Sequence, residues 1–353
     1  MLGIKTAYSC LVKVNSNQVV YFLTEGSKAK GFGHLTRCIS IQQAFAQKGV
    51  DSVFFVHGDQ SAWNLLRGMR YEPVDWVRNP EAIISRLKPN DLVVLDSLEA
   101  DLSSIEQIIK NVRHPVIIDD YKHYTYSHGI VVDWTLFAEE RGLNNDKITF
   151  LAGSDYVALR KPFWNILPRT GERDVKRILI TMGGTDVRNL TFPLLKCLVF
   201  HLKGVHVSAL VNESFGNLRE IEQFKTEQET VSLYYRLKDF EIAACFEQTD
   251  LAISAGGQTL YELARTGTPT IAIQIADNQE HDIRGWLRTG FIEFAGLWNE
   301  EHLLNRVLEM IRTLSGNADL RKKKQITGMK YVDGQGAHRL VERIISLAND
   351  VQE

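Results

Sequence analysis

The sequence predicts an α/β protein built from two Rossmann-like, doubly wound domains that face each other across a cleft. Three observations lead to this prediction: the chain has 353 residues, short apolar runs alternate with helical stretches, and the alternation begins again near the midpoint. A chain of this length exceeds what one hydrophobic core normally holds. Alternating β and α segments are typical of parallel sheets covered by helices on both faces.

The first half contains β-branched, apolar runs that we expect to be buried parallel strands, because both faces of each run are apolar. These runs are 19–23, 53–56, 92–95, 116–119 and 130–133. Helical patterns lie over 61–70 and 103–110, and another helix is expected to open within the glycine-containing stretch 31–37. These segments predict one doubly wound sheet.

The second half repeats this pattern. A strand over 177–182 is followed by paired glycines and by a helix from about Leu190. A strand over 251–255 again leads into paired glycines, here with a helix over 259–265. The Gly-Thr-Pro run 267–269 ends that helix, and a strand follows over 270–275.

We place the division between the domains within the polar, proline-containing stretch 159–176, which is the expected linker. This gives an N-terminal Rossmann-like domain over 1–165, which carries the first glycine loop, and a C-terminal nucleotide-binding Rossmann-like domain over 166–353. The lysine run 322–324 is expected to lie on a solvated helix face.

Composition and charge argue against several classes of protein. Lys+Arg 41 against Asp+Glu 43 gives a net charge of -2, so no global basic field would recruit nucleic acid. No apolar run approaches the roughly 20 residues that span a bilayer, so we expect no integral membrane segment. Polar residues 15–18 interrupt the opening segment, which argues against a signal peptide. We expect a cytoplasmic protein that is a monomer by default.

The cysteines point in the same direction. The sequence has 4 cysteines and no CxxC pair, which argues against a metal site and against disulfides. They are Cys10, Cys38, Cys197 and Cys245. Cys38 is expected to be a small core residue rather than a nucleophile.

The stretch Gly31-Phe-Gly-His-Leu-Thr-Arg37 carries the strongest signal for chemistry. It lies between a strand and a helix, where free N–H groups and the helix dipole favour a phosphate. Gly31 and Gly33 permit a tight turn and the close approach of a ligand. His34 and Arg37 share one helix face, and a titratable imidazole there suggests catalysis as well as binding. The alternative is a plain turn with a capping histidine.

The loop Ser254-Ala-Gly-Gly-Gln-Thr259 is the second candidate. Its two glycines expose N–H groups at a helix start, which suits a diphosphate. Glu262 would not favour a nearby anion, so we expect it to accept hydrogen bonds from a ribose. Its alternative role is a capping box with Thr259. The amide pair Asn278-Gln279 follows the next strand, and we expect its amides to line the same side of the ligand site as this loop.

A third loop, Met182-Gly-Gly-Thr-Asp186, has the same strand–glycine–helix pattern. It either lines the cleft or simply starts a helix with Asn189 as the cap. Acidic residues also follow two strands of the first half, at Asp96 and at Asp119-Asp120, where both a catalytic and a structural role remain open. His123 and His128 lack a third ligand at a suitable spacing, so we predict no metal.

Taken in order, these motifs resemble a known family. They are Gly31-x-Gly-His-x-x-Arg37, Tyr156-Val-Ala-Leu-Arg-Lys-Pro-Phe163, Gly183-Gly-Thr-Asp186, Ser254-Ala-Gly-Gly-x-Thr259 with Glu262, Asn278-Gln279 and Asp333-Gly-x-Gly336. Over about residues 19–340 the chain resembles the pseudaminic acid pathway UDP-sugar hydrolases (PseG) and the related SpsG spore-coat polysaccharide proteins. The glycine loops alone fit the wider GT-B superfamily, including MurG-type transferases, whereas the His34 loop combined with the 156–163 segment is more particular to the hydrolases.

The resemblance implies a GT-B fold and an enzyme that cleaves a UDP-linked sugar at the anomeric carbon with inversion, releasing UDP and requiring neither metal nor cofactor. It implies His34 as the catalytic base. The loops and the resemblance together assign contact with the UDP-sugar to Gly31, Gly33, Arg37, Gly183, Gly184, Asp186, Ser254, Gly256, Gly257, Gln258, Thr259, Glu262, Asn278 and Gln279.

Two features depart from the family pattern. The family usually carries an aromatic residue where this chain has Leu98, and about eighteen residues precede the first strand. Both bear on which sugar is used. A glycosyltransferase on the same scaffold and a non-catalytic nucleotide-sugar binding protein therefore remain as alternatives to the hydrolase.

Overall fold

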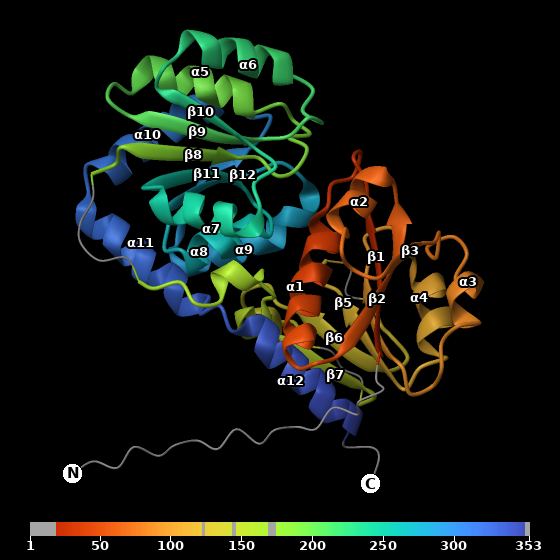
Figure 1. Cartoon of the computed structure of the whole chain (residues 1–353). Coiled ribbons are helices and arrows are strands. Elements are labelled where there is room, and N and C mark those ends of the chain that lie inside the picture. The colour runs from red at the N-terminus through yellow and green to blue at the C-terminus, as the bar shows by residue number, and fades with distance from the viewer. Residues whose placement is uncertain (1–18, 122–123, 143–145, 169–173, 350–353) are drawn as a thin grey trace, which may run out of the picture.

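The computed structural model describes residues 19–121, 124–142, 146–168 and 174–349 (Figure 1). The opening segment, Cys10 and His123 lie outside the described residues. Two parallel sheets organise the chain, one with seven strands and one with six. This confirms the predicted α/β class with two doubly wound, Rossmann-like sheets.

The first sheet has the strand order β3-β2-β1-β4-β5-β6-β7. Its strands are β1 Val19–Gly26, β2 Asp51–Gly58, β3 Tyr71–Pro73, β4 Leu92–Asp96, β5 His114–Ile118, β6 Gly129–Asp133 and β7 Ile148–Ala152. The helices that follow these strands are α1 Gly33–Gln47, α2 Gln60–Leu65, α3 Glu81–Ile84 and α4 Leu102–Ile109, with short 3₁₀ helices η1 Ala138–Glu140, η2 Ser154–Tyr156 and η3 Lys161–Phe163. All five residues of β4 are buried, as a central parallel strand requires.

The second sheet has the order β10-β9-β8-β11-β12-β13. Its strands are β8 Arg177–Thr181, β9 His206–Val211, β10 Val231–Tyr235, β11 Leu251–Ala255, β12 Thr270–Gln274 and β13 Ile292–Leu297. The helices are α5 Thr191–His201, α6 Leu218–Glu227, α7 Asp239–Gln248, α8 Thr259–Arg265, η4 Asp277–Gln279, α9 Glu280–Thr289, α10 Leu303–Ser315, α11 Ala318–Tyr331 and α12 Gly336–Asn349.

The last helix joins the two halves. After α11, the chain crosses back and α12 lies against α1, β5 and η2 of the first half (Figure 1). One hydrophobic cluster accordingly runs from Phe22 in β1 through Trp286 in α9 to Leu340 in α12. The division at 165/166 stays a prediction, and the segment placed in the second domain includes a helix that packs on the first sheet.

Two local predictions were wrong. The helix expected over 61–70 ends at Leu65, because the chain turns at Gly68, whose φ is 87°. The lysine run 322–324 is not a solvated face throughout. Lys324 is buried, its ammonium donating to the carbonyls of Gly290 and Ile292 at 3.0 and 3.1 Å.

The predicted linker is also different in character from what its polar composition suggests. In its described part, Leu159, Phe163 and Trp164 are buried. Trp164 Nε1 donates to Leu159 O at 2.7 Å, closing the segment on itself. Residues 158–166, which we call the connector, are therefore packed against the rest of the molecule. The residue before α12, Gln335, donates from Nε2 to the carbonyl of Trp164 in the connector at 3.0 Å.

The start of α12 provides a test of this packing. A Cβ added at Gly336 would lie 2.2 Å from the carbonyl oxygen of Val157, which is backbone and cannot swing away. We expect Gly336→Ala to lower the free energy of unfolding by about 1–3 kcal/mol, measured by denaturant unfolding.

The matched control is Gly316→Ala at the end of α10. The added Cβ there would meet only Arg312 O at 3.4 Å, with φ at -80°. We expect that variant to stay within about 0.5 kcal/mol of the wild type. Equal effects of the two substitutions would contradict a tight contact between the start of α12 and the backbone of Val157.

Candidate active site

The loop after β1 is built as the sequence predicts. A turn over 27–31 is closed by the N–H of Gly31 donating to Ser27 O at 2.9 Å and by the N–H of Ser27 donating to Gly31 O at 3.1 Å. Gly31 has φ 89°, a conformation that favours glycine. Helix α1 then begins at Gly33, which is exposed, and Phe32 before it provides no capping side chain. The first N–H groups of α1 therefore have no side-chain cap.

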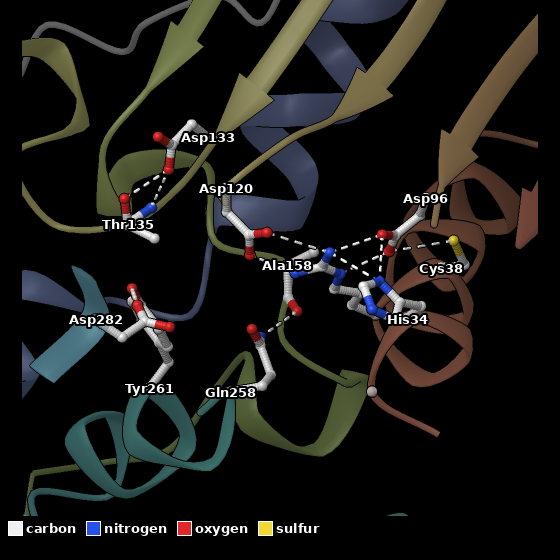
Figure 2. A network of polar contacts seen from close by, with 12 residues as sticks. His34, Cys38, Asp96, Asp120, Asp133, Thr135, Ala158, Gln258, Tyr261 and Asp282 are labelled. Atoms are coloured by element: carbon white, nitrogen blue, oxygen red, sulfur yellow. Dashed lines mark hydrogen bonds and ion pairs between the residues drawn. The ribbon is translucent and has the colours of Figure 1, made fainter. Parts of the chain in front are cut away.

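His34 lies on the first turn of α1 and is held by a buried network of charged groups (Figure 2). Its Nδ1 is 2.7 Å from Oδ1 of Asp96 at the end of β4. Arg37 donates to the same carboxylate through Nε at 2.6 Å and a terminal nitrogen at 2.7 Å. It also forms an ion pair with Asp120, which follows β5. The His34 side chain is 25% exposed, whereas that of Asp96 is fully buried.

The electrostatics of this network fix the role of each group. Burial alone would raise the pKa of Asp96, but Arg37 and His34 lower it to about 2. A terminal nitrogen of Arg37 also lies 3.0 Å from Nδ1. Because an ionised carboxylate can only accept, we assign the proton to Nδ1, which donates a hydrogen bond to Asp96, and this tautomer leaves the lone pair on Nε2. Nε2 is then the ring nitrogen that can take a proton from water, with Asp96 stabilising the imidazolium that forms.

The side chains of Arg37 and Cys38 both lie against the buried carboxylate of Asp96 in this arrangement. Burial would lower the pKa of Arg37, but Asp120 and Asp96 raise it well above its usual value, and its guanidinium is engaged by both carboxylates. Burial, reinforced by Asp96, raises the pKa of Cys38, and this thiol is buried as expected. The predicted contact of Arg37 with substrate stays a prediction.

The second loop joins β11 to α8 and is braced by the amide of Gln279. Gln279 Oε1 accepts from the N–H groups of Gly256 and Ile275 at 3.2 and 3.0 Å. A Cβ on Gly256 would lie 2.5 Å from Ile283 Cδ1, so close packing of α9 requires this glycine. Ser254 is fully buried and donates to Ala255 O at 2.9 Å, whereas Asn278 is exposed.

Helix α8 starts at Thr259 and carries Glu262 toward the connector. Gln258 at its N-cap donates from Nε2 to Ala158 O at 3.3 Å (Figure 2). Glu262 is buried, and its Oε1 accepts two hydrogen bonds from Arg160, at 2.8 and 2.6 Å. The capping-box alternative is not observed, since α8 has no side-chain cap. Sequence reasoning missed Arg160 as the partner of Glu262.

The third loop meets the first across the two halves. A Cβ at Gly184 would lie 3.8 Å from Phe32 Cδ2, so the loops after β8 and β1 adjoin. Asp186 is buried and accepts from the N–H groups of Leu190 and Thr191 at 2.9 and 2.8 Å. The expected cap Asn189 was therefore the wrong residue, because Asp186 satisfies the start of α5.

The two adjacent carboxylates after β5 have different roles. Asp119 accepts from the Tyr124 N–H at 2.9 Å and from the Tyr126 hydroxyl at 2.8 Å, which is a structural role. Asp120 turns to Arg37 instead. The neighbouring strands β1 and β4 place Thr24 beside Asp96, and this pairing brings the carboxylate next to the His34 loop.

Asp282 on α9 was not predicted as a site residue. It accepts a hydrogen bond from the Tyr261 hydroxyl (Figure 2). Burial raises the pKa of Asp282 to about 7, a shift that Tyr261 opposes and that Asp120 and Asp133 reinforce. Carboxylates at the strand ends of the first sheet therefore act electrostatically on a carboxyl group of the second half.

The described residues contain neither a metal-binding cluster nor a membrane-spanning helix. Across 19–121, 124–142, 146–168 and 174–349, no three His, Cys, Asp or Glu side chains are grouped as a metal would require. In the same ranges, no helix combines the length and apolar character needed to cross a bilayer.

Solved structures with this architecture identify the fold. MurG of Acinetobacter baumannii matches with a TM-score of 0.64 and 12% identity, over 93% of this chain and 99% of that one. Anabaena HepE, solved in complex with UDP-glucose, matches with a TM-score of 0.59 and 13% identity, over 94% and 100%. The chain therefore has the GT-B fold, which it shares with these two structures.

Two curated proteins are similar to this chain in sequence. A Helicobacter pylori protein named pseudaminic acid cytidylyltransferase and UDP-2,4-diacetamido-2,4,6-trideoxy-beta-L-altropyranose hydrolase is 25% identical, over 70% of this chain and 43% of its own. The spore coat polysaccharide biosynthesis protein SpsG of Bacillus subtilis is 21% identical, over 95% and 98%. These relatives confirm the resemblance predicted from the motifs.

Two further facts limit the comparison. The chain spans about half the length of two curated relatives, 43% of the H. pylori protein and 55% of an uncharacterized Methanocaldococcus jannaschii protein that is 23% identical over 72% of this chain. No family model matches the sequence.

The pKa of Asp282 leads to a prediction of pH-dependent stability. Between about pH 4 and pH 7 the folded protein keeps a proton on Asp282 that the unfolded chain has lost, so this residue lowers the free energy of unfolding as the pH rises. We expect Asp282→Asn, whose amide still accepts from Tyr261, to be more stable than wild type at pH 8 by about 1–3 kcal/mol. Near pH 4 the two proteins should unfold alike.

Denaturant unfolding at both pH values measures this difference. Asp319→Asn, at an exposed position on α11, is the control for removal of a negative charge. A stabilisation by Asp282→Asn that is the same at both pH values would contradict the assigned titration.

Proposed function

We propose that this chain hydrolyses a UDP-linked amino-deoxy sugar at the anomeric carbon with inversion, releasing UDP and the free sugar for nonulosonic acid or surface polysaccharide biosynthesis. The observation that carries the proposal is His34. Its imidazole is partly exposed at a helix start, and the ionised, buried Asp96 orients it through Nδ1. The names of the H. pylori and B. subtilis relatives support the substrate class.

In this mechanism His34 Nε2 removes a proton from water as the water attacks the anomeric carbon. Asp96 stabilises the resulting imidazolium, and Arg37 with Asp120 keeps Asp96 ionised and in place. The bond from the anomeric carbon to the phosphate oxygen breaks, and its electron pair leaves with UDP. Because UDP is a good leaving group, a second carboxyl group is not needed to protonate it, unlike in ordinary glycosidases.

The nucleotide would lie on the second half. The N–H groups of Gly257 and Thr259 at the start of α8, together with the Gly183-Gly184 loop, would hold the diphosphate. Gln279 braces the first of these loops through Gly256. Glu262 would accept from the ribose. Gly33 would allow the sugar to come close to His34, since a Cβ there would meet nothing within 4 Å.

The second candidate is a GT-B glycosyltransferase, in which a sugar hydroxyl replaces water. The GT-B fold supports it, and so does the structure of HepE, which shares this fold and was solved in complex with UDP-glucose. Sugar release from a UDP-sugar without an acceptor distinguishes hydrolase from transferase. A third candidate, a non-catalytic binding protein, would bind UDP in a calorimeter yet turn over no UDP-linked deoxy-diacetamido sugar.

The test of catalysis is UDP release from a panel of UDP-linked sugars, with proton NMR of the sugar product. We expect His34→Asn to lower kcat by about 10²–10⁴-fold while UDP binding is kept, because the variant loses its base. We expect Asp96→Asn to lower kcat as well, because its neutral amide neither fixes the tautomer of His34 nor stabilises the imidazolium.

His201→Asn is the control, since this exposed histidine lies at the end of α5, where its Nδ1 pairs with the carbonyl of Cys197. Retention of turnover within a few-fold in His34→Asn would remove His34 as the base. In ¹⁸O-labelled water, label should appear at C1 of the sugar. Label in UDP instead would mean attack at phosphorus.

A further inference from the structure

One face of α8 forms polar contacts with the connector between the halves. Gln258, Glu262 and Arg265 are spaced by four and three residues, so they lie along one side of the helix. Gln258 donates to Ala158 O, Glu262 binds Arg160, and Arg265 Nε donates to Phe163 O at 2.8 Å. The helix that opens at the second glycine loop is thus fastened to residues 158–166.

Arg160 is the charged member of this contact. Its side chain is 15% exposed, and its guanidinium lies over the Phe163 ring with Cζ 5.6 Å from the centroid. Nε and one terminal nitrogen both donate to Glu262 Oε1, at 2.8 and 2.6 Å. The other terminal nitrogen donates to Asp239 Oδ1 at 3.1 Å, at the start of α7.

The two carboxylate oxygens of Glu262 differ in their contacts with Arg160. Both contacts with Arg160 use Oε1, so Oε2 lies outside this ion pair. Burial raises the pKa of Glu262, and Arg160 is the group that opposes this shift, whereas Asp239 adds to it. A buried carboxylate is a strong hydrogen-bond acceptor only while it stays ionised and fixed in one orientation.

We propose that Arg160 is a positioning residue for nucleotide recognition, which holds the Glu262 carboxylate so that the ribose hydroxyls of a bound nucleoside diphosphate donate to it. This inference rests on the proposed function, because it requires a nucleotide at the loop before α8. It goes beyond that proposal by giving a role to the connector. The sugar half of the nucleoside is then recognised through a residue that belongs to neither glycine loop.

Three properties make arginine suited to this position. Its charge is permanent, its planar fork binds Glu262 and Asp239 together, and its guanidinium lies over the Phe163 ring. Lysine would keep the charge but concentrate it on one nitrogen. Methionine would keep much of the stem and remove the charge.

The experiment is calorimetric titration of the full chain with UDP and with 2′,3′-dideoxy-UDP. The ratio of the two dissociation constants reports hydrogen bonds to the ribose hydroxyls alone. For wild type we expect a preference for UDP of about 10–100-fold, as for hydrogen bonds to a charged group. In Arg160→Met this ratio should fall toward one, mainly through weaker binding of UDP, and Arg160→Lys should restore part of it.

Arg288→Met is the matched control. Arg288 also pairs with a glutamate across the two halves, Glu140 at 2.7 Å, but its guanidinium binds η1 instead of α8. It should keep the wild-type ratio. In a Glu262→Gln background, Arg160→Met should change the ratio no further, because Arg160 acts through Glu262. Circular dichroism and thermal unfolding check that each variant is folded.

The outcomes separate the two proposals. If wild type binds neither UDP nor its dideoxy analogue, the proposed function fails and this inference fails with it. If wild type prefers UDP but Arg160→Met weakens both ligands equally, only the inference fails, and Arg160 is structural. If Arg160→Met is unfolded, the ratio for Arg160→Lys decides, and a wild-type value there with unchanged UDP affinity overturns the proposal.

Discussion

The buried contact between Asp96 and Arg37 is the interaction on which the candidate site depends. A carboxylate and a guanidinium removed from water are costly unless each is paired and hydrogen-bonded. Here Asp96 is matched by Arg37 and His34, and Arg37 in turn by Asp120. The result is an imidazole with one nitrogen fixed and the other left for chemistry. Removing Arg37 would leave both Asp96 and Asp120 without their guanidinium partner.

The two halves contribute in different ways to the same region. The first sheet supplies the base and the charges that orient it, all at the ends of β1, β4 and β5. The second supplies glycine-rich helix starts, with N–H groups suited to phosphate. The connector and α12 join these parts. Backbone carbonyls of the connector accept hydrogen bonds from Arg265 of α8 and from Gln335, just before α12. In the proposed reaction, the base would come from the first half and the groups that bind the leaving UDP from the second.

Much of this could be predicted from the sequence, and the errors have physical causes. Strands such as β11 and helix α8 were predicted at their observed bounds, because apolar runs and glycine turns are local signals. Lys324 was assigned to solvent because a run of lysines usually lies there, but carbonyls of Gly290 and Ile292 accept from it. Asp186 displaced Asn189 as a cap because its carboxylate reaches forward to two N–H groups.

The sequence by itself determined the fold class, the positions of the glycine loops and the placement of His34 on a first helical turn. Each follows from residues close together in the chain. Only the tertiary structure decided that Asp96 orients His34 and that Arg160 binds Glu262, since these partners are separated by 62 and 102 residues. Strand order and domain packing bring them together, and neither is encoded in local periodicity. A carboxylate that follows a strand can be assigned to a site only when the neighbouring strands in the sheet are known.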